Sequence, residues 1–134
     1  MAAILQNPIG LIAGSGELPL AFVRQAQAKG LEVRVVAHKG ETSDVMNSLV
    51  KEINWVNVGQ FKKVINFFKK HDISQIAITG GINRTRLFGK NGVRPDWLAL
   101  KLASQIKSLR DNLLLPGIAN LIESYGIQVI SPGE

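Results

Sequence analysis

The residues best suited to chemistry near the start of the chain are two glycines that flank a serine. The stretch reads Ile9-Gly10-Leu11-Ile12-Ala13-Gly14-Ser15-Gly16-Glu17-Leu18-Pro19. An apolar run that passes through Gly14-Ser15-Gly16 into an amphipathic segment predicts a buried strand that turns into a helix. Glycines accept positive φ and allow a ligand to approach the backbone closely, and the first N–H groups of a helix favour an anion. We therefore interpret Gly14, Ser15, Gly16 and Glu17 as a phosphate-binding turn whose donors are backbone N–H groups, with a tight strand-to-helix turn that binds nothing as the alternative.

A second group of candidate residues follows a predicted strand at 75–79. It comprises Thr79, Gly80, Gly81, Asn83 and Arg84. The two glycines permit close backbone approach, and the amide and guanidinium groups are suited to hydrogen-bond a phosphate or a carboxylate. We interpret this stretch as a second wall of the phosphate site, with a flexible, solvated turn as the alternative.

His38 and Lys39 lie at the end of the predicted strand 32–37 and are further candidate residues for binding phosphate. Lys39 could meet the 2′-phosphate of NADP, which would make the chain a Rossmann domain of an oxidoreductase. The dinucleotide fingerprint also needs a third glycine, where this chain has Pro19. No His, Asp or Glu recurs at metal-ligand spacing, so the sequence predicts no metal site in this chain.

The elements that would position these residues alternate between strands and helices. Strands are predicted at 9–13, 32–37, 53–58, 75–79 and 127–130, and helices at 17–29, 61–70 and 94–109 and before Gly126. This alternation is typical of βαβ units, so we expect an α/β fold with a doubly wound, Rossmann-like, five-stranded parallel sheet of strand order 3-2-1-4-5. Both glycine-containing turns would then open onto the crevice between the first and fourth strands, where such sheets bind ligands.

Two local expectations accompany this fold. In the first helix, Leu18, Ala21, Phe22 and Val23 are expected to face inward. Pro116 lies near the start of the last helix, which either accommodates it in its first turn or begins later.

Composition narrows the class of protein. With 134 residues, no cysteine and 46% hydrophobic residues, the chain is expected to form one domain without disulfides or Cys-ligated zinc. No apolar run approaches the ~20 residues of a transmembrane helix, and the first residues lack the features of a signal peptide, so a cytoplasmic protein is expected.

The net charge of +6 is concentrated in one stretch. Residues 84–110 contain Asp96 as their single acid. Their basic residues are Arg84, Arg86, Lys90, Arg94, Lys101, Lys107 and Arg110. A solvated basic face and attraction of an anionic ligand or lipid surface are both compatible with this pattern. Nucleic acid is not expected as a partner, because aromatic residues are not interleaved with the basic ones and no nucleic-acid-binding motif occurs.

Several motifs occur in an order that points to one family. They are Ile12-Ala13-Gly14-Ser15-Gly16-Glu17-Leu18-Pro19, Ala37-His38-Lys39-Gly40-Glu41-Thr42, Trp55-Val56-Asn57-Val58-Gly59-Gln60-Phe61, Ile78-Thr79-Gly80-Gly81-Ile82-Asn83-Arg84, Arg94-Pro95-Asp96 and Arg110-Asp111-Asn112-Leu113-Leu114. Together they resemble the LpxI-type UDP-2,3-diacylglucosamine pyrophosphatases of bacterial lipid A biosynthesis, over essentially the whole chain.

This resemblance implies an activity and a domain arrangement. The enzyme would hydrolyse UDP-2,3-diacylglucosamine to UMP and 2,3-diacylglucosamine 1-phosphate (lipid X), with a divalent metal, magnesium. Residues 1–134 would be its N-terminal domain, and the catalytic acid would lie in a second domain, so this chain alone would hold substrate without catalysing the reaction. Arg84 would offset the charge of the pyrophosphate, and Arg110 and Asp111 would lie at the domain junction or cap a helix.

The same resemblance sets the expected partners. They are UDP-diacylglucosamine or its products, the second domain and the surface of the inner membrane, with homodimerisation left open. A stand-alone module that binds a nucleotide or a sugar phosphate is the alternative function.

Overall fold

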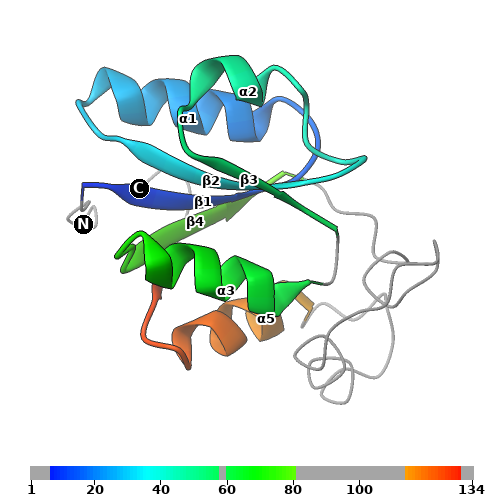
Figure 1. The fold of residues 1–134 in the computed structure, drawn as a ribbon, viewed down its shortest axis with the longest axis vertical. Helices are drawn as coiled ribbons and strands as arrows, with labels where there is room; N and C mark the ends of the chain where they lie inside the picture. Colours follow the sequence, from blue (N-terminus) through cyan, green and yellow to red (C-terminus); the bar gives the residue numbers. More distant parts are fainter. Residues whose placement is uncertain (1–6, 58–59, 81–113, 131–134) are drawn as a thin grey trace.

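The computed structural model describes residues 7–57, 60–80 and 114–130, and these form a parallel α/β sheet (Figure 1). Its strands are β1 (Ile9–Ala13), β2 (Val33–His38), β3 (Ile53–Val56), β4 (Gln75–Thr79) and β5 (Gln128–Ile130). Its helices are α1 (Leu18–Ala28), α2 (Met46–Leu49), α3 (Phe61–Lys70) and α5 (Leu114–Glu123). The five strands are ordered β3-β2-β1-β4-β5 and all pair in parallel. The predicted fold class and strand order are therefore confirmed.

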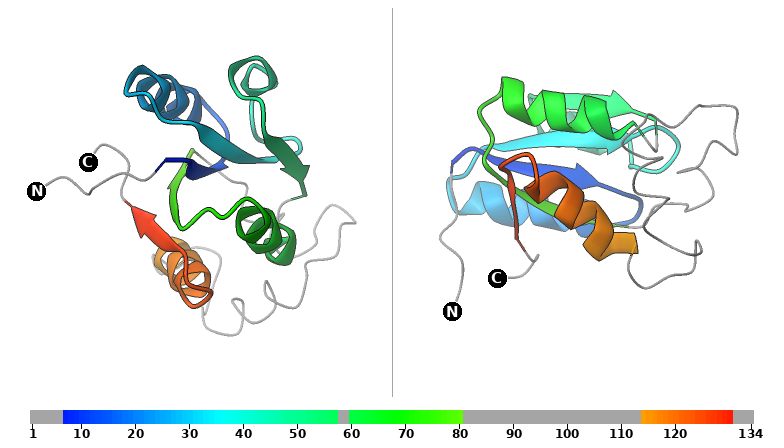
Figure 2. Two further views of the ribbon diagram at one scale, coloured as in Figure 1. Left: turned by 60° about the vertical axis from the view of Figure 1, so that its left-hand side comes forward. Right: turned by 90° about the horizontal axis from the view of Figure 1, so that it is seen from below.

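The sheet is covered on both faces, as two further views make clear (Figure 2). Helices α1 and α2 lie on one face and α3 and α5 on the other. Each face has its own apolar cluster: Leu20, Val23 and Met46 contribute to one, and Phe68 and Ile122 to the other. Burial on two faces explains why the strands read as nearly continuous apolar runs rather than as alternating patterns.

The middle strand, β1, is buried along its whole length. Gly10 in this strand has a specific packing role, because α3 lies directly against it. A Cβ placed on Gly10 would lie 2.6 Å from Ile76 Cγ2, 2.7 Å from Phe68 Cε1 and 2.9 Å from Ile73 Cγ2. Real Cβ atoms do not make contacts this short, so the missing side chain is what allows the Phe68 ring to approach the sheet.

Two local features differ from the sequence-based expectation. Leu18 is 68% exposed, not inward-facing, because it is the first residue of α1 and the buried stripe runs through Leu20, Val23 and Ala26 instead. Ala21 and Phe22 are half-buried beside that stripe. Helix α2 was not predicted, because its four residues are too few to show helical periodicity.

The C-terminal part agrees with one of the two alternatives for Pro116. Helix α5 begins at Leu114, so Pro116 lies in its first turn, where a backbone N–H has no intrahelical partner. Gly126 has a φ of +86° and follows the helix as expected.

The helix predicted at 94–109 lies outside the described residues. Across the ranges that the structure describes, none of the helices has the length and apolar character needed to cross a bilayer.

The packing at Gly10 gives a first prediction. Gly10→Ala should lower the free energy of unfolding by about 1–3 kcal/mol, because the added methyl group overpacks the contact between β1 and α3. Urea unfolding of the wild type and the variant measures this difference.

A second substitution tests the cause. Phe68→Leu removes part of the ring that the new methyl group would meet, so the double variant should lose less stability than the sum of the two single variants. Additive losses would show that Gly10 is not there to admit Phe68.

Candidate functional site

The predicted site residues that the structure describes gather at the carboxyl edge of the sheet. Strands β1, β2 and β4 lie side by side and end there, with Ala13 opposite Ala37 on one side and Thr79 on the other. The connection after β1 leads to α1 on one face, whereas α3, on the other face, leads into β4 (Figure 2). The boundary between β1 and β4 is therefore the point where ligands of doubly wound sheets bind.

The two glycine-containing turns meet at this boundary. The Gly14 N–H donates a hydrogen bond to the Thr79 carbonyl oxygen at 2.9 Å. Gly80 has a φ of +95°, and a Cβ placed there would lie 2.8 Å from both the Gly14 carbonyl carbon and the Ser15 carbonyl oxygen. A side chain at this position would thus be strained and would also collide with the neighbouring turn. The expectation that these two stretches lie together is confirmed for the residues up to Gly80.

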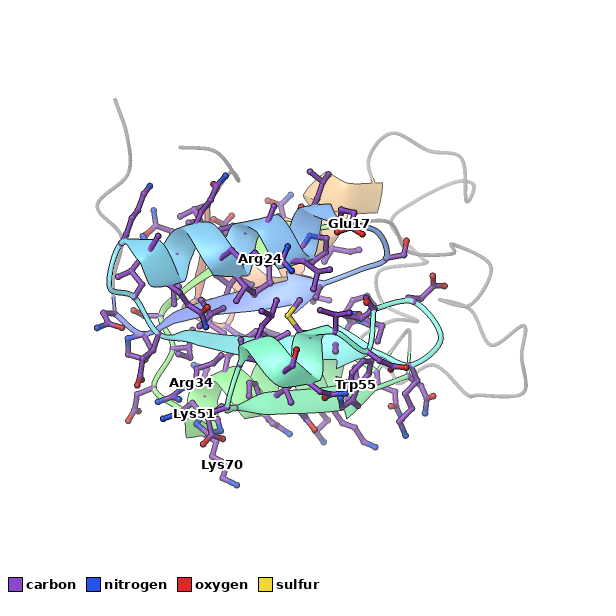
Figure 3. All side chains as sticks on the ribbon, turned by 90° about the horizontal axis from the view of Figure 1, so that it is seen from above. Glu17, Arg24, Arg34, Lys51, Trp55 and Lys70 are labelled. Atoms are coloured by element: carbon purple, nitrogen blue, oxygen red, sulfur yellow. The ribbon has the colours of Figure 1, made fainter. Side chains whose placement is uncertain are left out.

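Gly16 and Glu17 lead from the turn into α1. Gly16 is exposed and has a φ of +90°, and a Cβ placed there would have no atom within 4 Å. Glu17 is the N-cap residue of α1, and its side chain makes no capping hydrogen bond. Figure 3 shows Glu17 at this end of the helix. The helix therefore presents its positive dipole end and its first N–H groups beside an open position on the backbone.

Pro19 distinguishes this turn from the dinucleotide fingerprint. It lies in the first turn of α1, is buried, and its Cγ would lie 2.8 Å from a Cβ on Gly80. Pro19 thus takes the place of the third glycine while packing between the helix and the end of β4. It also removes one N–H donor from the helix end, which leaves the donors before it to meet an anion.

His38, at the end of β2, belongs to a buried group of hydrogen bonds. Its Nδ1 lies 2.8 Å from the Ala13 carbonyl oxygen, which also accepts a hydrogen bond from Thr42 Oγ1 at 2.7 Å. Thr42 Oγ1 accepts in turn from the His38 backbone N–H at 2.8 Å. Both residues are almost fully buried, with 4% and 7% of their surface exposed. The end of β2 is therefore joined to the end of β1 through side chains.

The electrostatics of this group favour a neutral imidazole. Burial lowers the pKa of His38 below its ordinary value, and the hydrogen bond to Ala13 and the Glu41 carboxylate offset only part of that effect. The Ala13 carbonyl can only accept, which assigns the proton of the neutral ring to Nδ1 and the lone pair to Nε2. His38 is thus a neutral hydrogen-bonding group at this edge and not a cation.

Of the remaining predicted site residues, the structure describes Lys39 alone. Lys39 is exposed, and its backbone N–H donates to the Val56 carbonyl oxygen at 2.9 Å, on the side of β2 that faces β3 and away from the glycine turn. The others, Gly81, Asn83, Arg84, Arg110 and Asp111, lie outside the described residues. Direct phosphate contact by Lys39 or by any of these five residues stays a prediction.

Thr42 is the residue of this site that sequence reasoning did not single out. The sequence feature that could have indicated it is a threonine four positions after the histidine at the end of a predicted strand. This spacing allows the chain to form a turn in which the threonine hydrogen-bonds back to the histidine. In the part of the chain that the structure describes, no three His, Asp or Glu side chains come together as a metal site. The described site is therefore built mainly from backbone groups and neutral side chains.

Two hollows lie away from this edge. One of about 340 Å³ is lined by residues that include Gln27, Arg34 and Lys51, and another of about 420 Å³ lies between β3 and α3. Figure 3 shows Arg34, Lys51 and Lys70 together at the end of the sheet opposite Glu17. The described residues that line these hollows include none of the predicted site residues.

The buried histidine gives a prediction about pH. Because the folded chain resists protonation of His38, stability should be greatest above about pH 6.5 and should fall as the pH drops toward the lowered folded pKa. The fall is at most about 1.4 kcal/mol per pH unit from this group. His38→Asn, which keeps a donor near the Nδ1 position and does not titrate, should lack this component.

Urea unfolding at several pH values from about 7.5 down to about 5 measures the two curves across the range in which histidine titrates. If the wild type and His38→Asn lose stability in parallel, His38 is not buried as a neutral ring.

Comparison with solved structures identifies the fold. The chain is similar to the biotin carboxylase domain of a thermophilic 2-oxoglutarate carboxylase bound to ADP (14% identity, TM-score 0.53, 92% of this chain and 22% of the other). It is similar to Bordetella bronchiseptica WbmG in complex with NAD and UDP (13% identity, TM-score 0.55, 92% of this chain and 36% of the other). It is also similar to the Thermus thermophilus UDP-glucose 4-epimerase in complex with NAD (14% identity, TM-score 0.53, 90% of this chain and 35% of the other). The chain thus spans only a part of each of these proteins, and at such low identity the likeness concerns the Rossmann-like fold alone.

Comparison of the sequences is more specific. No curated protein matches the chain significantly. A family description, that of the LpxI N-terminal domain, matches residues 8–134. Because this match covers nearly the whole chain, the protein belongs to the LpxI N-terminal domain family.

Proposed function

We propose that this chain is the substrate-holding domain of an enzyme that hydrolyses the pyrophosphate bond of UDP-2,3-diacylglucosamine. The products would be UMP and 2,3-diacylglucosamine 1-phosphate (lipid X), in lipid A biosynthesis. Membership of the LpxI N-terminal domain family over residues 8–134 supports the assignment. The observation in the structure that carries it is the turn of Gly14 to Gly16, which lies against Gly80 at the boundary between β1 and β4.

The turn would act on the diphosphate of the substrate. Backbone N–H groups of Ser15, Gly16 and Glu17 would donate hydrogen bonds to phosphate oxygens, and the dipole of α1 would favour their negative charge. Gly16 has open space on the side where a Cβ would point, so a phosphate can approach its backbone there. The Glu17 carboxylate would have to turn away from the ligand, and this residue would contribute its backbone N–H.

The second wall of the site would come from the stretch that begins at Gly80. In this proposal Asn83 and Arg84 meet the phosphates, and Arg84 offsets the charge that develops as the pyrophosphate bond breaks. Arg110 and Asp111 would contribute at the junction with a second domain, which would supply the catalytic acid.

The metal of the proposed reaction is magnesium, which would offset phosphate charge in the complete site. Among residues 7–57, 60–80 and 114–130, no three His, Asp or Glu side chains come together as a metal site. The proposed location is the cytoplasm, at the inner surface of the inner membrane, where a diacylated substrate would be met.

A matched pair of glycine substitutions tests the binding half of the proposal. Gly16 and Gly30 flank α1 at its two ends, with φ values of +90° and +83°, and a Cβ on either would meet no atom within 4 Å. Alanine at either position should therefore cost a similar ~1–2 kcal/mol of backbone strain. Only Gly16→Ala should weaken UDP binding, by about tenfold, because a methyl group would then stand where the phosphate approaches.

Isothermal titration of the chain with UDP, together with urea unfolding of both variants, measures the two effects. Equal affinity in Gly16→Ala and Gly30→Ala would remove the turn from the binding site.

The reaction itself needs a second assay. UMP release from UDP-2,3-diacylglucosamine, with magnesium present, is expected from the proposed two-domain enzyme and not from residues 1–134 alone. Release from neither would contradict the proposed reaction.

A further inference from the structure

A single peptide group, the one that joins Ala13 to Gly14, is held from both sides. Its carbonyl oxygen accepts hydrogen bonds from His38 Nδ1 at 2.8 Å and from Thr42 Oγ1 at 2.7 Å. Its N–H belongs to Gly14 and donates to the Thr79 carbonyl oxygen at 2.9 Å. The chain therefore enters the glycine turn through a peptide plane that is anchored to the end of β2 on one side and to the end of β4 on the other.

Thr42 reaches Ala13 because the chain after β2 closes on itself. The Thr42 backbone N–H donates to the His38 carbonyl oxygen at 2.9 Å, and the Glu41 N–H donates to the same oxygen at 3.0 Å. The Thr42 hydroxyl accepts from the His38 N–H while it donates to Ala13. A hydroxyl has one proton and two lone pairs, so both roles are satisfied at once. Serine can reproduce this pattern, whereas valine, of the same shape, cannot.

His38 supplies the other anchor through one ring nitrogen only. Nδ1 must carry its proton, since the Ala13 carbonyl has none to give. Because both side chains are buried, a lost partner would leave a polar group without a hydrogen bond inside the protein, which costs more than the same loss in water. The arrangement therefore depends on side chains that can keep these hydrogen bonds.

We propose that His38 and Thr42 are positioning residues for the phosphate-binding turn. They fix the Ala13–Gly14 peptide plane and so set the direction of the N–H groups of residues 15–17 toward the diphosphate of a nucleotide sugar. This inference rests on the proposed function, which makes the turn a phosphate site. It differs from the direct phosphate contact that was expected of His38 from the sequence.

The glycines explain why such an anchor is needed. Gly14 and Gly16 give the turn wide conformational freedom, and donors that must reorient on binding lose affinity to the entropy of ordering. Gly80 restrains the turn from the side of β4, where its Cα leaves no room for a Cβ beside the Gly14 carbonyl carbon. His38 and Thr42 complete the restraint from the side of β2.

Two pairs of substitutions separate positioning from other roles. Thr42→Ser keeps the hydroxyl, and Thr42→Val removes it while keeping the shape. His38→Asn places an amide N–H near the position of Nδ1, whereas His38→Gln places its amide near that of Nε2. We expect Thr42→Ser and His38→Asn to bind UDP within about twofold of the wild type, and Thr42→Val and His38→Gln to bind about tenfold more weakly.

A readout without ligand keeps the inference separate from the proposed function. NMR order parameters of the amides of residues 15–17 should fall in Thr42→Val and His38→Gln and stay at the wild-type value in the two conservative variants. The amide of Gly30, at the other end of α1, serves as the internal control and should not change. If Thr42→Val does not fold, the comparison of His38→Gln with His38→Asn carries the same test.

The outcomes are distinct. A wild-type chain that does not bind UDP contradicts the proposed function, while the order parameters still decide the positioning role. Unchanged order parameters at 15–17 in Thr42→Val and His38→Gln overturn the positioning role, whatever the affinity for UDP. Loss of UDP binding in His38→Asn with ordered amides at 15–17 also overturns it for His38 and indicates that the ring contacts the ligand directly.

Discussion

The structure depends on one constraint, which is that β1 is paired along both edges and covered on both faces. A strand in that position has no free backbone edge and no free face, so the space around it must be filled by close packing. Gly10 satisfies this on one face by admitting Phe68. At the carboxyl end the chain must leave the sheet between two neighbouring strands, and the glycine turn begins there. The site is therefore a consequence of how the central strand ends.

Much of this architecture was predictable from the sequence. Apolar runs separated by helical periodicity predicted five strands, and right-handed crossovers then limited their order to the one observed. The errors arose where local pattern is weak: Leu18 has the character of a core residue but is the first residue of its helix, and α2 is a single turn. The bonds of His38 and Thr42 to Ala13 were beyond prediction, because they join positions 25 and 29 residues apart. A sequence pattern records which residues can donate, and only the fold decides which carbonyl they meet.

The described part of the site divides its work between backbone and side chains. In the proposed site, the groups that would meet a ligand are backbone N–H groups, which carry no net charge and do not act as acids or bases at neutral pH. The buried side chains, His38 and Thr42, instead hold the backbone in place, and burial keeps His38 neutral. A site of this composition can bind and orient a phosphate through donors whose charge does not change with pH. That division fits a substrate-holding domain whose reaction is completed by groups from elsewhere.

The glycines at the carboxyl edge illustrate the same division at atomic scale. Gly80 and Gly16 both have positive φ, yet their surroundings are opposite. A side chain on Gly80 would collide with Gly14 and Ser15, so a glycine at this position allows the ends of β4 and β1 to pack closely. A side chain on Gly16 would meet no atom within 4 Å, so close packing does not explain it.

Conformational strain alone would account for a glycine at position 16, as it does at Gly30. What separates the two is their place in the chain: Gly30 follows α1, whereas Gly16 precedes it, close to the Ala13–Gly14 peptide that His38 and Thr42 hold by hydrogen bonds. In the proposed site, the open position at Gly16 would thus be the point of this edge where backbone donors and free space lie together.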